Sequence, residues 1–305
     1  MNYGPLIFLA AFFALTSSWY GFVLTPQMQV GRLHVTNSLA GATYPLSRPG
    51  QAREGLDVYR ANGCAYCHSQ QVVQSAVTCD LILTEAGTNQ SKMLSALSQI
   101  DSSLTPAQTT ALLARLPKTV LHGVKRETAD AAIRGFKDAD AKYELWIVPV
   151  GPDISRGWGK RRSVAQDFLY DYPVMLGVQR IGPDLANVGS RLPDANWHLL
   201  HLYAPRLKEK NSVMPPYRFL FETRDIRQTP SPDALPLSGE LAPPAGKEIV
   251  PKPEAKALVA YLMSLRENAP LYVAPFTVPA PPPAGTNAPG VAAAASTNPV
   301  PTTAK

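Results

Sequence analysis

Cysteine is scarce in this chain of 305 residues, which has only Cys64, Cys67 and Cys79. A small, odd number of cysteines argues against a framework of disulfide bonds, and the isolated Cys79 is expected to be a buried, unreactive thiol. The chain also lacks a block of lysine and arginine with interleaved aromatic residues, although its net charge is +6. Because the basic residues are scattered, nucleic acid is not expected as a partner.

Charged side chains are missing from the N-terminal stretch, where Pro5–Leu24 forms a nearly continuous apolar run. About 20 such residues suffice to span a bilayer as a helix. Tyr3 stands at one end and Trp19 and Tyr20 at the other, as aromatic residues do at a membrane interface. A cleaved signal peptide is the alternative, but it requires a basic start and a small-x-small cleavage site. The sequence therefore favours a retained transmembrane anchor over residues 1–26.

Shifts in composition divide the remaining chain into segments. A connector is predicted over 27–52, a mostly helical domain over 53–267, and a disordered Pro/Ala-rich tail over 268–305. Inside the domain, residues of about 74–156 are predicted to form a helical insert. Helical periodicity is found in Arg53–Asn62, Ser91–Ile100, Pro106–Leu116, Glu127–Ala139 and Glu254–Arg266.

The motif Cys-x-x-Cys-His, formed by Cys64, Cys67 and His68, is typical of a c-type haem attachment site. Two thiols one helical turn apart each form a thioether with a haem vinyl group, and the next histidine supplies an axial nitrogen. A redox Cys-x-x-Cys belongs in a βαβ pattern, which is absent. A zinc site needs a second pair of ligands nearby, and His198 and His201 are far away in the sequence. One covalently attached haem c is therefore predicted.

A methionine or histidine is expected as the sixth iron ligand if the protein only transfers electrons. Met214 lies in a proline-stiffened loop, which suits the presentation of a thioether to iron. Met214 is therefore the predicted ligand, and Met175 is the alternative. Met93 lies in the insert, and Met263 lies on a helix where it is expected to fill the core.

Attachment of haem c also predicts the orientation of the chain. It takes place outside the cytoplasmic membrane, where the maturation machinery works. The N-terminus is therefore expected in the cytoplasm, and the chain after about Pro26 in the periplasm. The predicted protein is a single-pass protein of the inner membrane.

Beyond the haem motif, several runs resemble subunit II of the cbb-type haem-copper cytochrome c oxidases, a membrane-anchored mono-haem cytochrome c. A further run, Leu258–Leu262, is similar to the last helix of class I cytochromes c. The runs that carry the resemblance to subunit II are Gly55–Tyr59, Ser69-Gln70, Val164–Pro173, Arg180–Gly189, Trp197-His198, His201-Leu202, Pro205-Arg206 and Met214-Pro215.

The resemblance implies a class I cytochrome c-like haem domain with defined roles for its residues. His68 would be the proximal ligand, with its ring N–H on the carbonyl of Pro183. Met214 would be the distal ligand. Arg180 and Trp197 would be neighbours of the haem propionates, and surface exposure is the alternative for Arg180.

The resemblance also implies a contact between the first and last helices of the domain. Gly55 and Tyr59 would pack against Tyr261. His198 and His201 would be helix residues near the haem rather than ligands.

Two features depart from the family pattern. The insert is not part of it, and we expect its apolar stripes to bury against a partner. The run Met175–Gln179 stands where a tryptophan and a lysine would be expected.

The function implied is electron transfer without catalysis by this chain itself. Electrons would come from another c-type cytochrome and pass to the polytopic catalytic subunit of a haem-copper oxidase. The alternatives are the cytochrome c subunit of a nitric oxide reductase and a free-standing anchored electron shuttle or redox sensor. A haem enzyme with an open iron site, such as a peroxidase, would require the absence of a methionine ligand.

Overall fold

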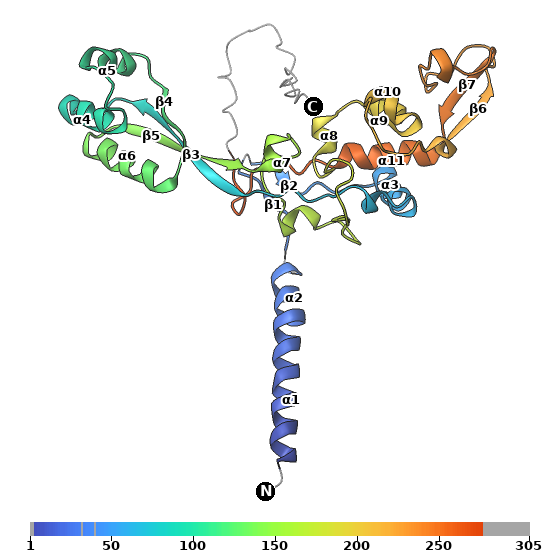
Figure 1. The fold of residues 1–305 in the computed structure, drawn as a ribbon, viewed down its shortest axis with the longest axis horizontal. Coiled ribbons are helices and arrows are strands. Elements are labelled where there is room, and N and C mark those ends of the chain that lie inside the picture. The colour runs from blue at the N-terminus through green and yellow to red at the C-terminus, as the bar shows by residue number, and fades with distance from the viewer. Residues whose placement is uncertain (1–2, 32, 40, 277–305) are drawn as a thin grey trace.

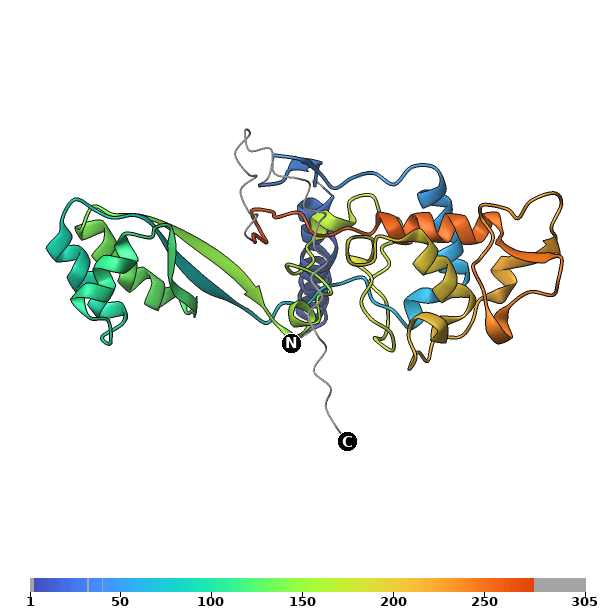
Figure 2. The same ribbon diagram turned by 90° about the horizontal axis from the view of Figure 1, so that it is seen from above.

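The computed structural model describes residues 3–276 except 32 and 40. One long N-terminal helix leads to two lobes that lie on opposite sides of its end (Figures 1 and 2). The main lobe contains the cysteine motif and comprises residues 51–72 and 158–265, and the insert lobe comprises residues 76–150. Most of the regular structure is helical, as the sequence predicted.

The N-terminal helix consists of α1 (Gly4–Trp19), a π-helical stretch η1 (Tyr20–Leu24) and α2 (Thr25–Val30). Within the described residues, Gly4–Gln29 is the one helix long and apolar enough to cross a membrane, and its apolar window is not buried by the rest of the protein. The Thr16 hydroxyl donates to the Phe12 carbonyl at 2.9 Å, which satisfies this polar group within the helix. The helix predicted over the apolar run is confirmed, and it is compatible with a membrane anchor.

The main lobe is built on the crossing of α3 (Gln51–Ala61) and α11 (Pro253–Ser264). A side chain on Gly55 would overlap the carbonyl of Ala257, so glycine lets the two backbones touch. The rings of Tyr59 and Tyr261 meet edge to face with their centroids 5.3 Å apart. The helix contact expected from the class I cytochromes is therefore present in this chain.

The remaining elements of the main lobe are short. Among them, α9 supplies Leu200 and Leu202 to the core that α3 and α11 form. An antiparallel pair, β6 and β7, closes the far end of the lobe. The elements are η2 (Cys64–Tyr66), η3 (Ala165–Phe168), α8 (Val188–Arg191), α9 (Ala195–Tyr203), α10 (Pro205–Lys208), η4 (Arg218–Leu220), β6 (Phe221–Asp225), η5 (Gly239–Leu241) and β7 (Lys247–Pro251).

The insert lobe contains a sheet in addition to the helices predicted for the insert from the sequence. The three expected helices are present, but they accompany a three-stranded antiparallel sheet of order β4-β3-β5. The alternation of Cys79, Leu81 and Leu83 with more exposed residues is a strand signal that the helical periodicity around it obscured. The elements are β3 (Ala76–Glu85), α4 (Gln90–Ile100), α5 (Pro106–Leu113), β4 (Lys118–Val124), α6 (Arg126–Asp138), β5 (Lys142–Val150) and the following turn α7 (Pro152–Ser155).

The sheet also supplies the partner that the apolar stripes of the insert need. Leu81 and Leu83 on β3 form one buried cluster with Met93 and Leu97 on α4 and with Phe136 on α6. The expectation that these stripes bury against another subunit is therefore wrong, because they form a core within the insert lobe itself. Short helices of this kind are stabilised by such packing rather than by their own propensity.

A buried ion pair fastens the connector to the base of the main lobe. Asp167 accepts hydrogen bonds from Arg161 at 2.9 and 2.7 Å, and both side chains are fully buried. The hydroxyl of Tyr44, on the short hairpin of β1 (Thr36–Asn37) and β2 (Thr43–Tyr44), donates to the same carboxylate at 2.7 Å. Arg161 Nε donates to the carbonyl of Ala269 at 2.6 Å.

The predicted tail therefore begins with residues that pack. Leu271 and Ala274 are buried and pair with each other, and the Pro270 carbonyl accepts a hydrogen bond from the backbone of Leu39. Disorder was predicted over 268–305, and of this range residues 277–305 lie outside the described residues.

Candidate haem site

The cysteine motif follows directly on α3. Gly63 takes a left-handed conformation with φ of +67°, which ends the helix. The next turn is η2, and the backbone N–H of His68 donates to the Cys64 carbonyl at 3.0 Å. Cys64 and Cys67 are free, half-buried thiols. Burial raises the pKa of Cys64 to about 11, so this thiol is neutral before any thioether forms.

The ring of His68 is oriented by a loop more than a hundred residues away. Its Nδ1 lies 2.8 Å from the Pro183 carbonyl oxygen, which accepts only, so Nδ1 carries the proton. This leaves the lone pair of Nε2 free for a metal. Burial lowers the pKa of His68, and the hydrogen bond to Pro183 opposes that shift. A side chain at Gly182 would overlap the imidazole, so glycine is required beside the ring.

The two methionine candidates both lie in the main lobe. Met214 and Met175 are partly buried and pack against the main core. The Met214 backbone N–H donates to the Ser212 hydroxyl at 3.2 Å, which helps to shape the proline-rich loop. The choice of Met214 as distal ligand stays a prediction.

Arg191 and His201, which lie close enough to His68 for their charges to interact with it, each have a buried nitrogen atom without a hydrogen-bond partner. Arg191 donates through Nη2 to the Asp184 carbonyl at 2.9 Å, but its buried Nη1 is unpaired. The Nδ1 atom of His201 is likewise buried and unpaired. The ring of His201 stacks on Trp197 with centroids 4.7 Å apart and planes 8° from parallel.

The pKa values of these groups are lowered, burial being the largest cause. Burial, followed by the proximity of His198 and His68, lowers the pKa of His201 to about 4, so this ring is neutral at pH 7. Burial also lowers the pKa of Arg191, whereas Asp184 opposes the shift.

The residues present fit a haem. Two thiols and an oriented imidazole are the groups that would attach and ligate it, and an unpaired buried guanidinium suits a propionate. Unpaired buried polar groups are costly, so Arg191 Nη1 and His201 Nδ1 are atoms for which a bound group would supply partners. Sequence reasoning missed Arg191, although it lies only two residues beyond the run Arg180–Gly189 that carried the family resemblance.

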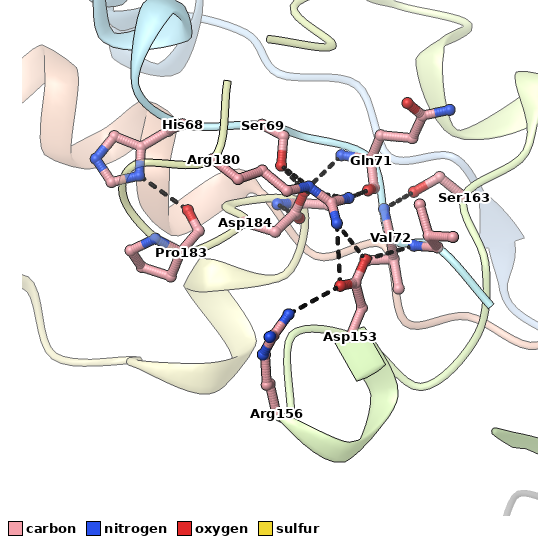
Figure 3. A network of polar contacts seen from close by, with 12 residues as sticks. His68, Ser69, Gln71, Val72, Asp153, Arg156, Ser163, Arg180, Pro183 and Asp184 are labelled. Carbon is pink, nitrogen blue, oxygen red and sulfur yellow. Dashed lines mark hydrogen bonds and ion pairs between the residues drawn. The ribbon is translucent and has the colours of Figure 1, made fainter. Parts of the chain in front are cut away.

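Arg180, a predicted propionate neighbour, is engaged elsewhere in the structure (Figure 3). Its Nε donates to the Ser69 hydroxyl at 2.9 Å, its Nη1 donates to Asp153 at 3.0 Å, and its Nη2 donates to the Gln71 carbonyl. Asp153 is buried and also accepts from the backbone of Val73 at 2.7 Å. In the described structure Arg180 thus ties the haem motif to the junction with the insert lobe, and its propionate role stays a prediction.

Asp184 completes this network on the side of the histidine. Its carboxylate accepts from the Ser69 hydroxyl at 2.5 Å and from the Gln71 backbone at 2.8 Å. Asp184 therefore holds the segment after His68 against the loop of Pro183. This contact fixes the distance between the Pro183 carbonyl and the His68 ring (Figure 3).

A comparison with known families finds a match to part of the chain. Residues 146–236 match the family described as cytochrome C oxidase, mono-heme subunit/FixO. The matched segment includes Arg180, Pro183, Trp197 and Met214. No curated protein matches the chain. Over these residues the chain is similar to the mono-haem subunits of cytochrome c oxidase, which confirms the resemblance to subunit II that the sequence motifs predicted.

Proposed function

We propose that this chain carries one covalently attached haem c and relays electrons from a c-type donor to the catalytic subunit of a cbb-type terminal oxidase. The family of mono-haem oxidase subunits supports the haem and the catalytic partner. The observation that carries the proposal is the His68–Pro183 contact, since it holds Nε2 unprotonated beside two free thiols.

Each residue of the site has a defined task in this proposal. Cys64 and Cys67 would attach the cofactor, and His68 and Met214 would ligate its iron. A haem held by these residues would supply one-electron transfer between its ferric and ferrous states. Arg191 offsets a propionate charge that would otherwise be buried without a partner.

The same proposal orients the protein in the membrane. The helix Gly4–Gln29 anchors the chain in the inner membrane, and both lobes lie on the periplasmic side, where haem c is attached. Oxygen reduction takes place in the catalytic subunit, and this chain itself is not catalytic.

Purification from native membranes in mild detergent tests the proposed function. We expect a polytopic subunit with haem and copper to come down with this chain, in a complex that oxidises reduced cytochrome c with oxygen. A complex that reduces nitric oxide instead, or the recovery of this chain alone with its haem, would contradict the proposal.

The identity of the distal ligand gives a separate prediction. Met214→Leu should abolish the weak sulfur-to-iron absorbance of the oxidised protein, and Met214→His should lower the reduction potential, because a thioether ligand favours the ferrous state. Met175→Leu is the matched control, since Met175 packs against the same core. If Met175→Leu removes the band and Met214→Leu retains it, the assignment is wrong.

A further inference from the structure

Exposed apolar side chains form a patch beside the cysteine motif of the main lobe. It consists of Tyr66, Leu176, Val178 and Ile181, and we call it the motif patch. Their exposed fractions are 69%, 41%, 71% and 57%. Tyr66 stands between the two cysteines, and the other three belong to the loop that precedes the Pro183 turn. Large apolar side chains gathered at a functional site commonly mark an interaction surface.

The backbone holds this loop firmly against the motif. The N–H of Val178 donates to the Ala65 carbonyl at 2.9 Å, and the N–H of Gly182 donates to the Cys67 carbonyl at 2.9 Å. Between them, Gly177 has a φ of +88° and lies so close to the motif backbone that a side chain there would overlap it. The exposed side chains are thus displayed by an anchored backbone, and this reduces the entropy lost when they are covered.

The motif patch carries little net charge. The run from Tyr172 to Gln179 contains no charged residue. The next residue, Arg180, is neutralised by Asp153 at 2.9 Å and by Asp184 at 3.9 Å. Charge therefore gives this surface little power to steer a diffusing partner.

The loop also lies on the side of the main lobe that faces the anchor. In Figure 1 the yellow-green segment that leads to α8 extends lower than α3, toward the end from which the N-terminal helix leaves. A subunit embedded in the same membrane would meet this side of the lobe.

We infer that the motif patch is the surface on which the catalytic subunit docks, through an apolar surface of its own. The inference rests on the proposed function and names the contact that the function requires. Permanent interfaces are more apolar than transient ones, whereas encounters with a diffusing donor depend on charge. A neutral, anchored, apolar surface directly beside the haem motif fits the permanent partner, and it brings the site of the cofactor close to that partner.

The full-length chain with Val178→Glu and Ile181→Glu, produced in cells that contain the oxidase, tests the inference. We expect the recovery of the polytopic subunit in mild detergent to fall about tenfold or more, because two carboxylates would be buried without partners. The haem absorbance of the variant should be unchanged. The amount of polytopic subunit recovered with the natural chain should vary little between low and high salt, because an apolar contact is not screened by salt.

The matched control carries the same two charges elsewhere, as Val77→Glu and Leu207→Glu, on β3 and α10, where both side chains are about half exposed. It should retain full recovery, and an equal loss in the control would overturn the inference. Full recovery in the patch variant would overturn it as well, and so would a lost haem absorbance, which would place these residues in the haem pocket. Full recovery with slower electron entry from reduced cytochrome c would assign the patch to the donor. If the natural chain brings down no polytopic oxidase subunit, the proposed function itself fails.

Discussion

Replacing both Cys64 and Cys67 with alanine should leave a polypeptide that retains no haem after denaturation. The two thiols are free and half-buried in the turn that precedes the oriented imidazole of His68. Axial ligation by a histidine and a methionine does not survive unfolding, whereas thioether bonds do. Staining for haem peroxidase activity on a denaturing gel measures the difference directly.

Cys79 provides the matched control for this experiment. It is 2% exposed and lies on β3 of the insert lobe, whereas the cysteine motif lies in the main lobe. Cys79→Ala should retain full staining, since this thiol takes no part in the attachment. Each single variant, Cys64→Ala or Cys67→Ala, should retain stain through the remaining thioether. Staining in the double variant, or haem that acid acetone extracts from the natural protein, would contradict covalent attachment.

Asp167→Ala is expected to lower the free energy of unfolding by about 3–5 kcal/mol, because it removes the carboxylate that pairs directly with the buried guanidinium of Arg161. Both side chains are fully buried, and their two hydrogen bonds measure 2.9 and 2.7 Å. The change also removes the acceptor for the Tyr44 hydroxyl and for the backbone N–H of Val164. Denaturant unfolding of the detergent-solubilised protein, followed by circular dichroism, measures the loss.

Asp130→Ala is the control, because Asp130 pairs with Arg126 at 2.9 Å on the exposed face of α6. An exposed pair one helical turn apart contributes only about 0.3–0.5 kcal/mol. The double variant Arg161→Met, Asp167→Leu removes both charges and should recover much of the stability. If Asp167→Ala costs less than about 1 kcal/mol, the ion pair is not isolated from water as the structure shows it.

Several features of this protein follow from local sequence patterns. The apolar run Pro5–Leu24 predicted the N-terminal helix, because a membrane span is a matter of length and composition. The Cys-x-x-Cys-His spacing predicted the haem motif. The contact of Gly55 and Tyr59 with Tyr261 was implied by resemblance, and the structure contains it.

The insert shows where local pattern is insufficient. Its three helices could be located from their periodicity, but the sheet could not, since strand pairing joins segments far apart in the chain. The helical pattern alone therefore predicted that another subunit covers the apolar faces of these helices. In the structure these faces pack against Leu81 and Leu83, on a strand of the same lobe.

By itself the sequence determined the apolar N-terminal helix, the haem motif and the family resemblance, because these depend on residues that are close together or in a recognisable order. Only the tertiary structure showed that Arg161 joins Asp167 to the carbonyl of Ala269, 108 residues away. It alone showed that Arg180 is engaged by Asp153, and that Arg191 retains an unpaired buried nitrogen. The physical reason is that the partner of a buried charge is chosen by which segments meet in the folded core, and no spacing along the chain specifies that meeting.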